Sequence, residues 1–136
     1  MTPLQSLNAV LLKSGEGNGI RLTTPAEIKI WSAEIGDASA RLTAILDDWS
    51  LVTITDLGIE RIHLVGDVVG TTKIRTTSPI LHIDLQAGYV LTLSDSIYQL
   101  GTPREGEPDM NKVLAIGKTI TSWRGSQGRK PWGTLQ

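Results

Sequence analysis

The chain has 136 residues, of which 40% are hydrophobic, and a formal net charge of −1. This length and composition fit one globular domain with a core of its own. Cysteine is absent, which excludes disulfides and thiolate chemistry, and no apolar run approaches the roughly 20 residues of a membrane-spanning helix. Because the N-terminus also lacks the basic and apolar pattern of a signal peptide, we expect a cytoplasmic protein with no membrane partner.

Two capping signals predict helices in the first third of the chain. Thr2-Pro3-Leu4-Gln5 predicts a short N-terminal helix, which a glycine-rich connection follows up to residue 23. Thr24-Pro25-Ala26-Glu27 predicts the start of a main helix over residues 24–49, because apolar residues then recur at steps of three and four. Gly36-Asp37 leaves open whether this helix is continuous or is two shorter helices with a bend.

Residues 50–101 predict an antiparallel β region. Leu51 to Thr55 has the alternation of a first strand, and Asp56-Leu57-Gly58 follows it as a turn. The next strand, Ile62 to Val69, contains Gly66, which predicts a bend or the close approach of another backbone. A short strand is expected at Lys73 to Thr77, and Ser78-Pro79 marks a break after it.

The strongest β signal is a hairpin on either side of Gly88. Residues 80–86 alternate strictly between apolar and polar side chains, and a second strand begins at Tyr89. A three-residue loop over 86–88, with Gly88 in the left-handed conformation, would pair Leu85 with Tyr89 and Ile83 with Leu91 on one apolar face. We therefore predict that loop length and that register.

The last part of the chain predicts a loop and a helix over 102–123, capped by Asp109, and then a basic, solvated tail over 124–136. Residues 118–136 carry four basic and no acidic side chains, so the first 117 residues carry a net charge of −5. These patterns together predict a single α+β domain over residues 1–136. It would be an antiparallel sheet or small open barrel of four to six short strands, packed by one long helix, with short helices at both ends.

Few residues point to chemistry. His82 and Asp84 share a strand face that His63 could join, which makes a metal site geometrically conceivable, but a solvent-facing polar surface explains the same pattern. Asp47 and Asp48 would end the main helix, where acids oppose the helix dipole and point apart, so they make a poor acid–base pair. We therefore expect neither metal nor cofactor, and catalysis at an unrecognised site stays a minor alternative.

Four segments carry a resemblance to a known group of proteins: Gly66 to Val69, Ile74 to Pro79, Gly88 to Thr92, and Tyr98 to Gly101. In these segments, about a third of the chain, the sequence resembles small uncharacterised bacterial proteins carried on plasmids, phages and prophages. The resemblance implies an accessory gene product and no particular activity.

By elimination, we expect a non-enzymatic protein-binding accessory protein, with inhibition of a host or defence enzyme as one form of this function. The main alternative is a nucleic-acid-binding protein that uses the basic tail, where arginine lies near tryptophan. The apolar residues that recur along the main helix could also contact a second copy of the chain, so a homodimer is a further alternative. The candidate partner-binding residues are Asp47, Asp48, His82, Asp84, Arg124, Arg129, Lys130 and Trp132.

Overall fold

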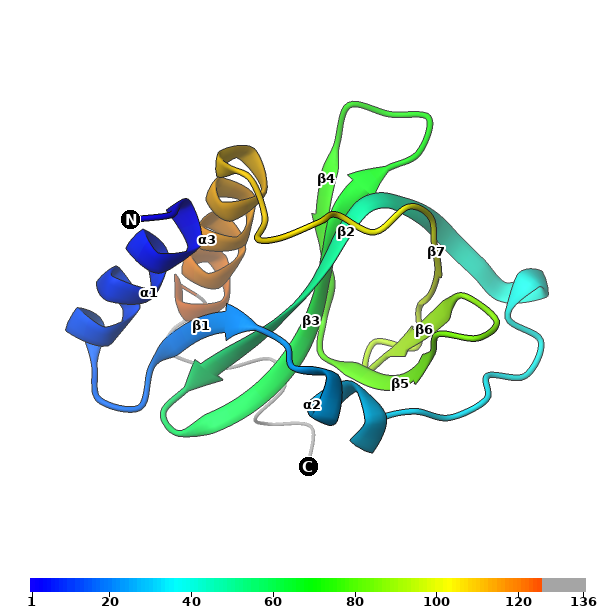
Figure 1. Cartoon of the computed structure of the whole chain (residues 1–136), viewed down its shortest axis with the longest axis horizontal. Helices are drawn as coiled ribbons and strands as arrows, with labels where there is room; N and C mark the ends of the chain where they lie inside the picture. The colour runs from blue at the N-terminus through cyan, green and yellow to red at the C-terminus, as the bar shows by residue number, and fades with distance from the viewer. Residues whose placement is uncertain (126–136) are drawn as a thin grey trace.

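The computed structural model describes residues 1–125 and consists of three α-helices, one 3-10 helix and seven strands (Figure 1). In chain order these are α1 (Pro3–Ser14), β1 (Gly19–Leu22), α2 (Pro25–Ile30), the 3-10 helix η1 (Ser39–Arg41), β2 (Leu42–Asp56), β3 (Ile59–Val68), β4 (Ile74–Thr76), β5 (Ile80–Asp84), β6 (Tyr89–Thr92), β7 (Ile97–Leu100) and α3 (Met110–Gly125). The fold is thus mixed α+β, as the sequence predicts. No helix within residues 1–125 combines the length and apolar character needed to cross a membrane.

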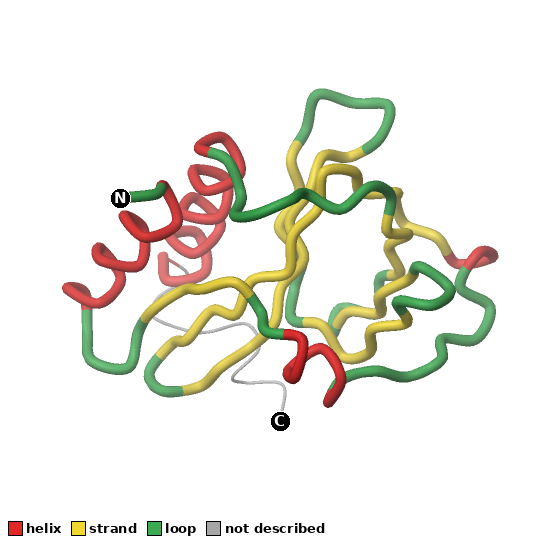
Figure 2. The backbone as a smooth tube through the Cα atoms, viewed as in Figure 1, coloured by secondary structure: helices red, strands yellow, loops and turns green. Residues whose placement is uncertain are grey.

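The long strand β2 is the centre of the sheet. The strand order is β4-β3-β2-β7-β6-β5, and β1 pairs with β2 outside this path. One edge of β2 pairs with β3, while its other edge pairs with β7 near Leu42–Leu46 and with β1 near Val52–Thr55. The β2–β7 pair is parallel and the other pairs are antiparallel, so the predicted all-antiparallel sheet is corrected to a mixed one. The sheet curls so that β5 and β6 come round to face β2 and β3 (Figure 2).

The curled sheet has a hydrophobic core on each side. Helices α1 and α3 lie together on the outer side of β1–β4, and between them lies the first core, which includes Leu11, Val52 and Ile116 (Figure 1). The second core lies inside the curl and includes Leu46, Leu64 and Ile83. Strands β2 and β3 contribute to both cores, which explains why they carry apolar residues on both faces.

Local signals near the chain ends and turns are confirmed. Thr2 and Thr24 each accept a hydrogen bond from the backbone of the third helical residue and complete a capping box. The Asp109 carboxylate accepts from the backbone N–H of Lys112 at 3.0 Å and so caps α3. Gly66 is also confirmed as a point of close approach, because a Cβ there would lie 3.0 Å from the carbonyl oxygen of Asp47.

The predicted main helix over 24–49 is corrected, because α2 ends at Ile30 and residues 42–56 are a strand. Asp37 has a positive φ of 54°, which is incompatible with a continuing helix. Within residues 42–49, Ala44, Leu46 and Trp49 all pack in or against the second core, and the bulge between Asp47 and Ser50 interrupts the strand alternation that would otherwise mark this segment. Asp47 and Asp48 consequently lie at a β-bulge of β2 and not at a helix end.

The predicted hairpin register is also corrected. Gly88 does have a positive φ of 85°, but Asp84 pairs with Tyr89 and Ile83 with Val90, which makes the loop four residues long. The Asp84 carboxylate accepts from the N–H of Ala87 at 3.0 Å and closes this longer turn, while Leu85 becomes half exposed. The sheet has seven strands where the sequence predicts four to six, because β1 lies in the segment assigned to a connection.

Candidate functional site

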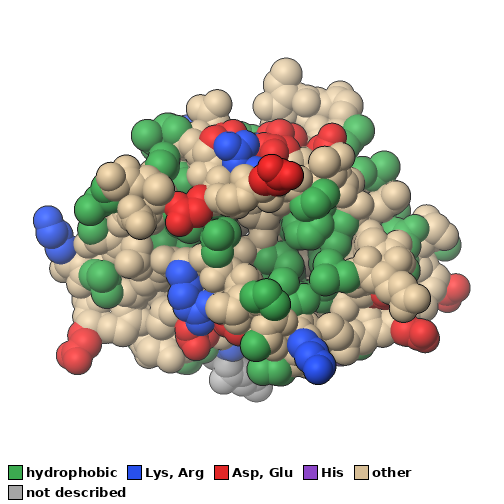
Figure 3. All heavy atoms as spheres, in the orientation of Figure 1, with side chains coloured by type: hydrophobic (Ala, Val, Ile, Leu, Met, Phe, Trp, Pro, Cys, Tyr) green, Lys and Arg blue, Asp and Glu red, His purple; other side chains and the backbone are tan. Residues whose placement is uncertain are grey.

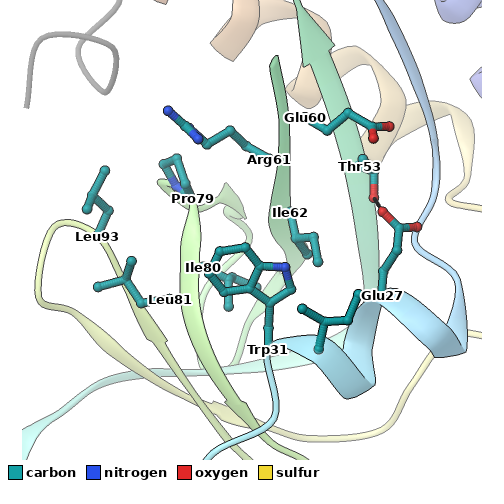
Figure 4. Close-up of a pocket in the computed structure, with 11 residues that line it drawn as sticks. Glu27, Trp31, Thr53, Glu60, Arg61, Ile62, Pro79, Ile80, Leu81 and Leu93 are labelled. Atoms are coloured by element: carbon teal, nitrogen blue, oxygen red, sulfur yellow. Dashed lines mark hydrogen bonds between the residues drawn. The ribbon is translucent and has the colours of Figure 1, made fainter. Parts of the chain in front are cut away.

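An open cleft lies between α2, β3 and β5 and has a volume of about 480 Å³ (Figure 4). Its apolar lining is Ile30, Trp31, Ile62, Pro79, Ile80, Leu81 and Leu93. This volume is within the range of sites that hold a ligand or a buried side chain of a partner. We call it the Trp31 cleft, because the indole of Trp31 lies between the strand that carries Ile62 and the segment that carries Pro79 and Leu81.

Trp31 is placed by the end of α2 and by the edge of β5. It follows the last residue of α2, and its backbone N–H donates to the carbonyl of Ile28 at 3.2 Å. Its own carbonyl accepts from the N–H of Ile83 at 2.9 Å, which ties this segment to β5. The side chain nevertheless remains 43% exposed, and the adjacent Ile30 is 76% exposed. Two large apolar residues are therefore fixed in position and open to solvent at the cleft.

A hydrogen-bonded acidic group forms the polar rim. Glu27 receives two bonds from Arg21, at 2.5 and 3.1 Å, and one from the hydroxyl of buried Thr53 at 3.2 Å. Arg21 also donates to Glu60 at 2.8 Å. The Arg21 guanidinium lowers the pKa of Glu27 to about 2, so this carboxylate stays ionised at neutral pH. A carboxylate with so low a pKa is not poised to act as a general acid or base near neutral pH.

Arg61 is the other charged side chain at the cleft, and it extends past Pro79 at the mouth (Figure 4). Within residues 1–125, no hydrogen bond or ion pair engages its guanidinium. Its charge is therefore available to an acidic group on a binding partner.

An ion cluster around a buried lysine lies elsewhere, where α3 begins beside the bulge of β2. The Lys112 side chain is 3% exposed, and its ammonium contacts Asp48 at 2.7 Å, Asp67 at 3.3 Å and Asp109 at 3.5 Å. Arg104 bridges Asp48 and Asp109 at 3.1 and 3.4 Å. Acidic side chains with a basic one between them are visible at the top of the face in Figure 3, where the chain crosses towards α3 in Figure 1.

The charges of this cluster stabilise one another. Burial alone would lower the pKa of Lys112, but its hydrogen bond to Asp48 and the charges of Asp109 and Asp67 raise it overall. Hydrogen bonding from the Lys112 ammonium in turn lowers the pKa of Asp48. The pKa of Asp109 is lowered mainly by the hydrogen bond from the backbone N–H of Lys112, with a further contribution from the charge of its ammonium. Asp48 also has a positive φ of 47° in the bulge, a conformation that these contacts hold in place. The cluster thus fastens α3 to the sheet.

His63 is buried and has a structural role. Its ring stacks on Trp123 with centroids 5.1 Å apart, and its Nδ1 donates to the carbonyl of Thr77 at 2.8 Å. Burial lowers the pKa of His63 to about 4. In the described part of the chain, no group of three or more His, Asp or Glu residues is arranged to hold a metal ion.

This burial makes stability depend on pH between about 4 and 6.5. The unfolded chain binds a proton at His63 near pH 6.5, whereas the folded protein does so only near pH 4. The free energy of unfolding should therefore fall by about 1 kcal/mol per pH unit as pH is lowered through this window. Urea titrations of wild type and His63→Asn at several pH values test this, because the variant should lose the slope. An equal slope in both proteins contradicts the assignment.

The candidate residues from the sequence lie in separate places. Asp47 accepts from the N–H of Thr102 at 2.6 Å, and Asp48 belongs to the ion cluster. His82 is exposed on β5, and Asp84 closes the adjacent turn. Arg124 belongs to α3, which extends beyond the predicted end at residue 123, and it contacts Asp56 at 3.4 Å. Arg129, Lys130 and Trp132 lie outside the described residues.

Sequence reasoning missed the cleft residues. Trp31 and Ile28 fitted one apolar helical seam, so exposure of Trp31 was not expected. The sequence does contain one indication of a shorter helix: Gly36 follows soon after the Thr24 cap and limits how far a helix can extend.

A second apolar groove of about 610 Å³ lies between α1 and α3, with Leu7, Val10, Met110 and Leu114 in its lining. Helix backbones satisfy their own hydrogen bonds, so this groove offers only side chains to a partner.

Comparison with protein-family models, curated proteins and solved structures finds no match for the chain.

Proposed function

We propose that the protein is a non-enzymatic binding module that recognises another protein through the Trp31 cleft. The observation that carries this proposal is an apolar cleft of about 480 Å³ flanked by the exposed side chains of Trp31 and Ile30. Exposed aromatic and aliphatic side chains beside a hollow are typical of protein-binding surfaces. A partner would desolvate these side chains, which favours association.

The polar groups at the cleft favour binding over catalysis. Arg21 donates hydrogen bonds to both Glu27 and Glu60, and the Thr53 hydroxyl donates to Glu27. Glu27 remains ionised because of its low pKa. A catalytic acid or base needs a pKa near the working pH and a proton within reach of the substrate. The arrangement is better suited to give the rim a fixed charge pattern that orients a partner.

We further propose that the partner is a host or defence enzyme that this protein inhibits. This finer proposal follows the resemblance to accessory proteins of mobile elements that the sequence suggests, and the net charge of −5 on residues 1–117 supports it. An acidic body is suited to a basic partner surface, such as the substrate-binding face of an enzyme that acts on nucleic acid.

Binding of nucleic acid by the basic C-terminal segment is the rival proposal. The segment contains Arg129, Lys130 and Trp132, and this mixture of basic and aromatic residues favours contact with single strands. Binding of this kind should weaken steeply with salt and should disappear when the chain ends at Gly125.

Site-specific photo-crosslinking tests the proposed function. The photoreactive amino acid p-benzoylphenylalanine replaces Ile30 at the cleft or, as a control, Leu114 on α3, which is 54% exposed. In lysate of the cells that encode the protein, we expect a discrete protein adduct from position 30 that is absent from position 114. The adduct should survive truncation after Gly125 and disappear when Trp31 is also replaced by alanine. Adducts that are identical at both positions, or absent at position 30, would overturn the proposal.

A further inference from the structure

The outer edge of β3 beside the Trp31 cleft is the feature that identifies what the cleft binds. We infer that the ligand is an extended segment of a partner protein, which adds as a strand to the edge of β3 at Glu60–Ile62. This inference rests on the proposed function and specifies the partner segment. It commits to a segment with an apolar side chain for the cleft and an acidic side chain for Arg61.

The direction of the backbone groups follows from the pairing of β3. In an antiparallel pair, successive residues direct their N–H and C=O groups alternately towards and away from the neighbouring strand. Leu64 directs its groups away from β2, because its carbonyl accepts from the N–H of Thr77 at 2.9 Å and its N–H donates to the Thr77 hydroxyl at 3.1 Å. Ile62 and Glu60, two and four residues earlier, direct their groups to the same outer edge.

This outer edge is open next to the cleft. Strand β4 pairs with Val65–Asp67 of β3, and among the described residues no strand pairs with the outer edge of Ile59–Ile62. The edge of β5 is not open in the same way, because the segment after α2 pairs with it through a bridge between Ser32 and Ile83. Unpaired strand edges readily accept an extended peptide backbone.

The side chains beside this edge indicate the chemistry of the added segment. Glu60, Arg61 and Ile62 all line the cleft, with Pro79 and Leu81 on its opposite side (Figure 4). An added strand would point every second side chain into the cleft, where Trp31 and Ile62 favour an aliphatic or aromatic group. Glu27 and Glu60 are already paired with Arg21, so the charge left to attract a partner is that of Arg61.

A matched pair of substitutions at Glu60 isolates the backbone. Both Glu60→Ala and Glu60→Pro remove the contact with Arg21, but only proline removes the outward N–H. Proline is tolerated at a strand edge where its nitrogen faces away from the neighbouring strand, so the β2–β3 pairing should persist. Thermal unfolding followed by circular dichroism checks that both variants fold.

Peptides from a displayed random heptapeptide library are selected on the intact wild-type protein and then measured by fluorescence anisotropy. We expect selected peptides to carry alternating apolar residues and an acid, and to bind Glu60→Pro about tenfold more weakly than Glu60→Ala. N-methylation of single peptide bonds, which leaves peptide side chains intact, should cause a similar loss at alternate positions. This second measurement uses the wild-type protein, so it tests strand addition even if Glu60→Pro fails to fold.

The outcomes separate the inference from the proposed function. Peptides that lose affinity for Trp31→Ala but bind both Glu60 variants equally and tolerate N-methylation would overturn strand addition and leave the cleft as the binding site. Selected peptides that are unaffected by Trp31→Ala, or no enrichment on wild type over that variant, would overturn both.

Discussion

Replacing Lys112 with methionine should lower the free energy of unfolding at pH 7 by about 2 kcal/mol, since it removes the charge-assisted hydrogen bonds of a buried ammonium while the partly exposed aspartates regain water. Lys112 is buried and contacts three aspartates. Without its ammonium, Asp48 and Asp109 would keep Arg104 as a basic neighbour, and Asp67 would keep no ion-pair partner among the described residues. Urea denaturation monitored by tryptophan fluorescence measures the change. The midpoint should shift while the dependence on denaturant stays the same.

The same substitution at Lys118 is the matched control. Lys118 lies on α3 as well but is exposed, so its replacement by methionine should change stability by no more than about 0.5 kcal/mol. Equal effects of the two substitutions would show that the cluster does not fasten α3 to the sheet.

The pH dependence of this loss has a definite sign. The Lys112 ammonium is the main cause of the lowered pKa of Asp48, whereas the lowered pKa of Asp109 depends mainly on the backbone N–H of residue 112, which methionine retains. The contribution of the ammonium through Asp48 is complete above the unfolded pKa near 4 and is lost as pH falls below it. The difference between wild type and Lys112→Met should therefore be largest near neutral pH and shrink below about pH 4. A difference that stays constant with pH would mean that packing of the Lys112 stem dominates.

The parts of the fold that sequence reasoning predicted depend on short-range chemistry. The capping boxes at Thr2 and Thr24, the Asp109 cap and the left-handed Gly88 each involve groups within a few residues of one another. Such patterns have one favourable local solution, so the sequence alone can indicate it.

Strand β2 and the β5–β6 register could not be predicted in this way. The apolar positions of residues 42–49 fit a helix because a bulge between Asp47 and Ser50 breaks their alternation, and this bulge forms in the pairing of β2 with β3. The loop of the β5–β6 hairpin is set by the Asp84 cap and by a bulge between Ile80 and His82, which shift the alternation by one residue. Tertiary contacts decided both cases.

The candidate site was missed for a related reason. The prediction favoured charged residues, and the structure places most of the described ones in internal roles: Asp48 contacts Lys112, Asp84 closes a turn and Arg124 contacts Asp56. The cleft instead combines Trp31 with residues about 30 and 50 positions further along the chain. No spacing in the sequence relates such distant segments, so only the folded sheet brings them together.

Replacing Trp31 with alanine should weaken binding of the partner identified by crosslinking by about 30-fold or more, a loss of about 2 kcal/mol. Trp31 is the largest side chain of the cleft and is 43% exposed, so a partner can cover it and remove the remaining apolar surface from water. Isothermal titration calorimetry with the purified partner measures the dissociation constant. The heat-capacity change of binding should also become less negative, because less apolar surface is buried.

The structure explains why this change should affect binding far more than folding. The contacts that fix this segment are the backbone bonds of residue 31 to Ile28 and Ile83, and alanine retains both. Leu114→Ala removes a similarly exposed apolar side chain from α3 and should leave the affinity unchanged. If both variants bind equally well, or if Trp31→Ala loses affinity only in proportion to a loss of folded protein, the cleft is not the binding surface. A selective loss of affinity in a folded Trp31→Ala protein would instead place the partner against the edge of the sheet between β3 and β5.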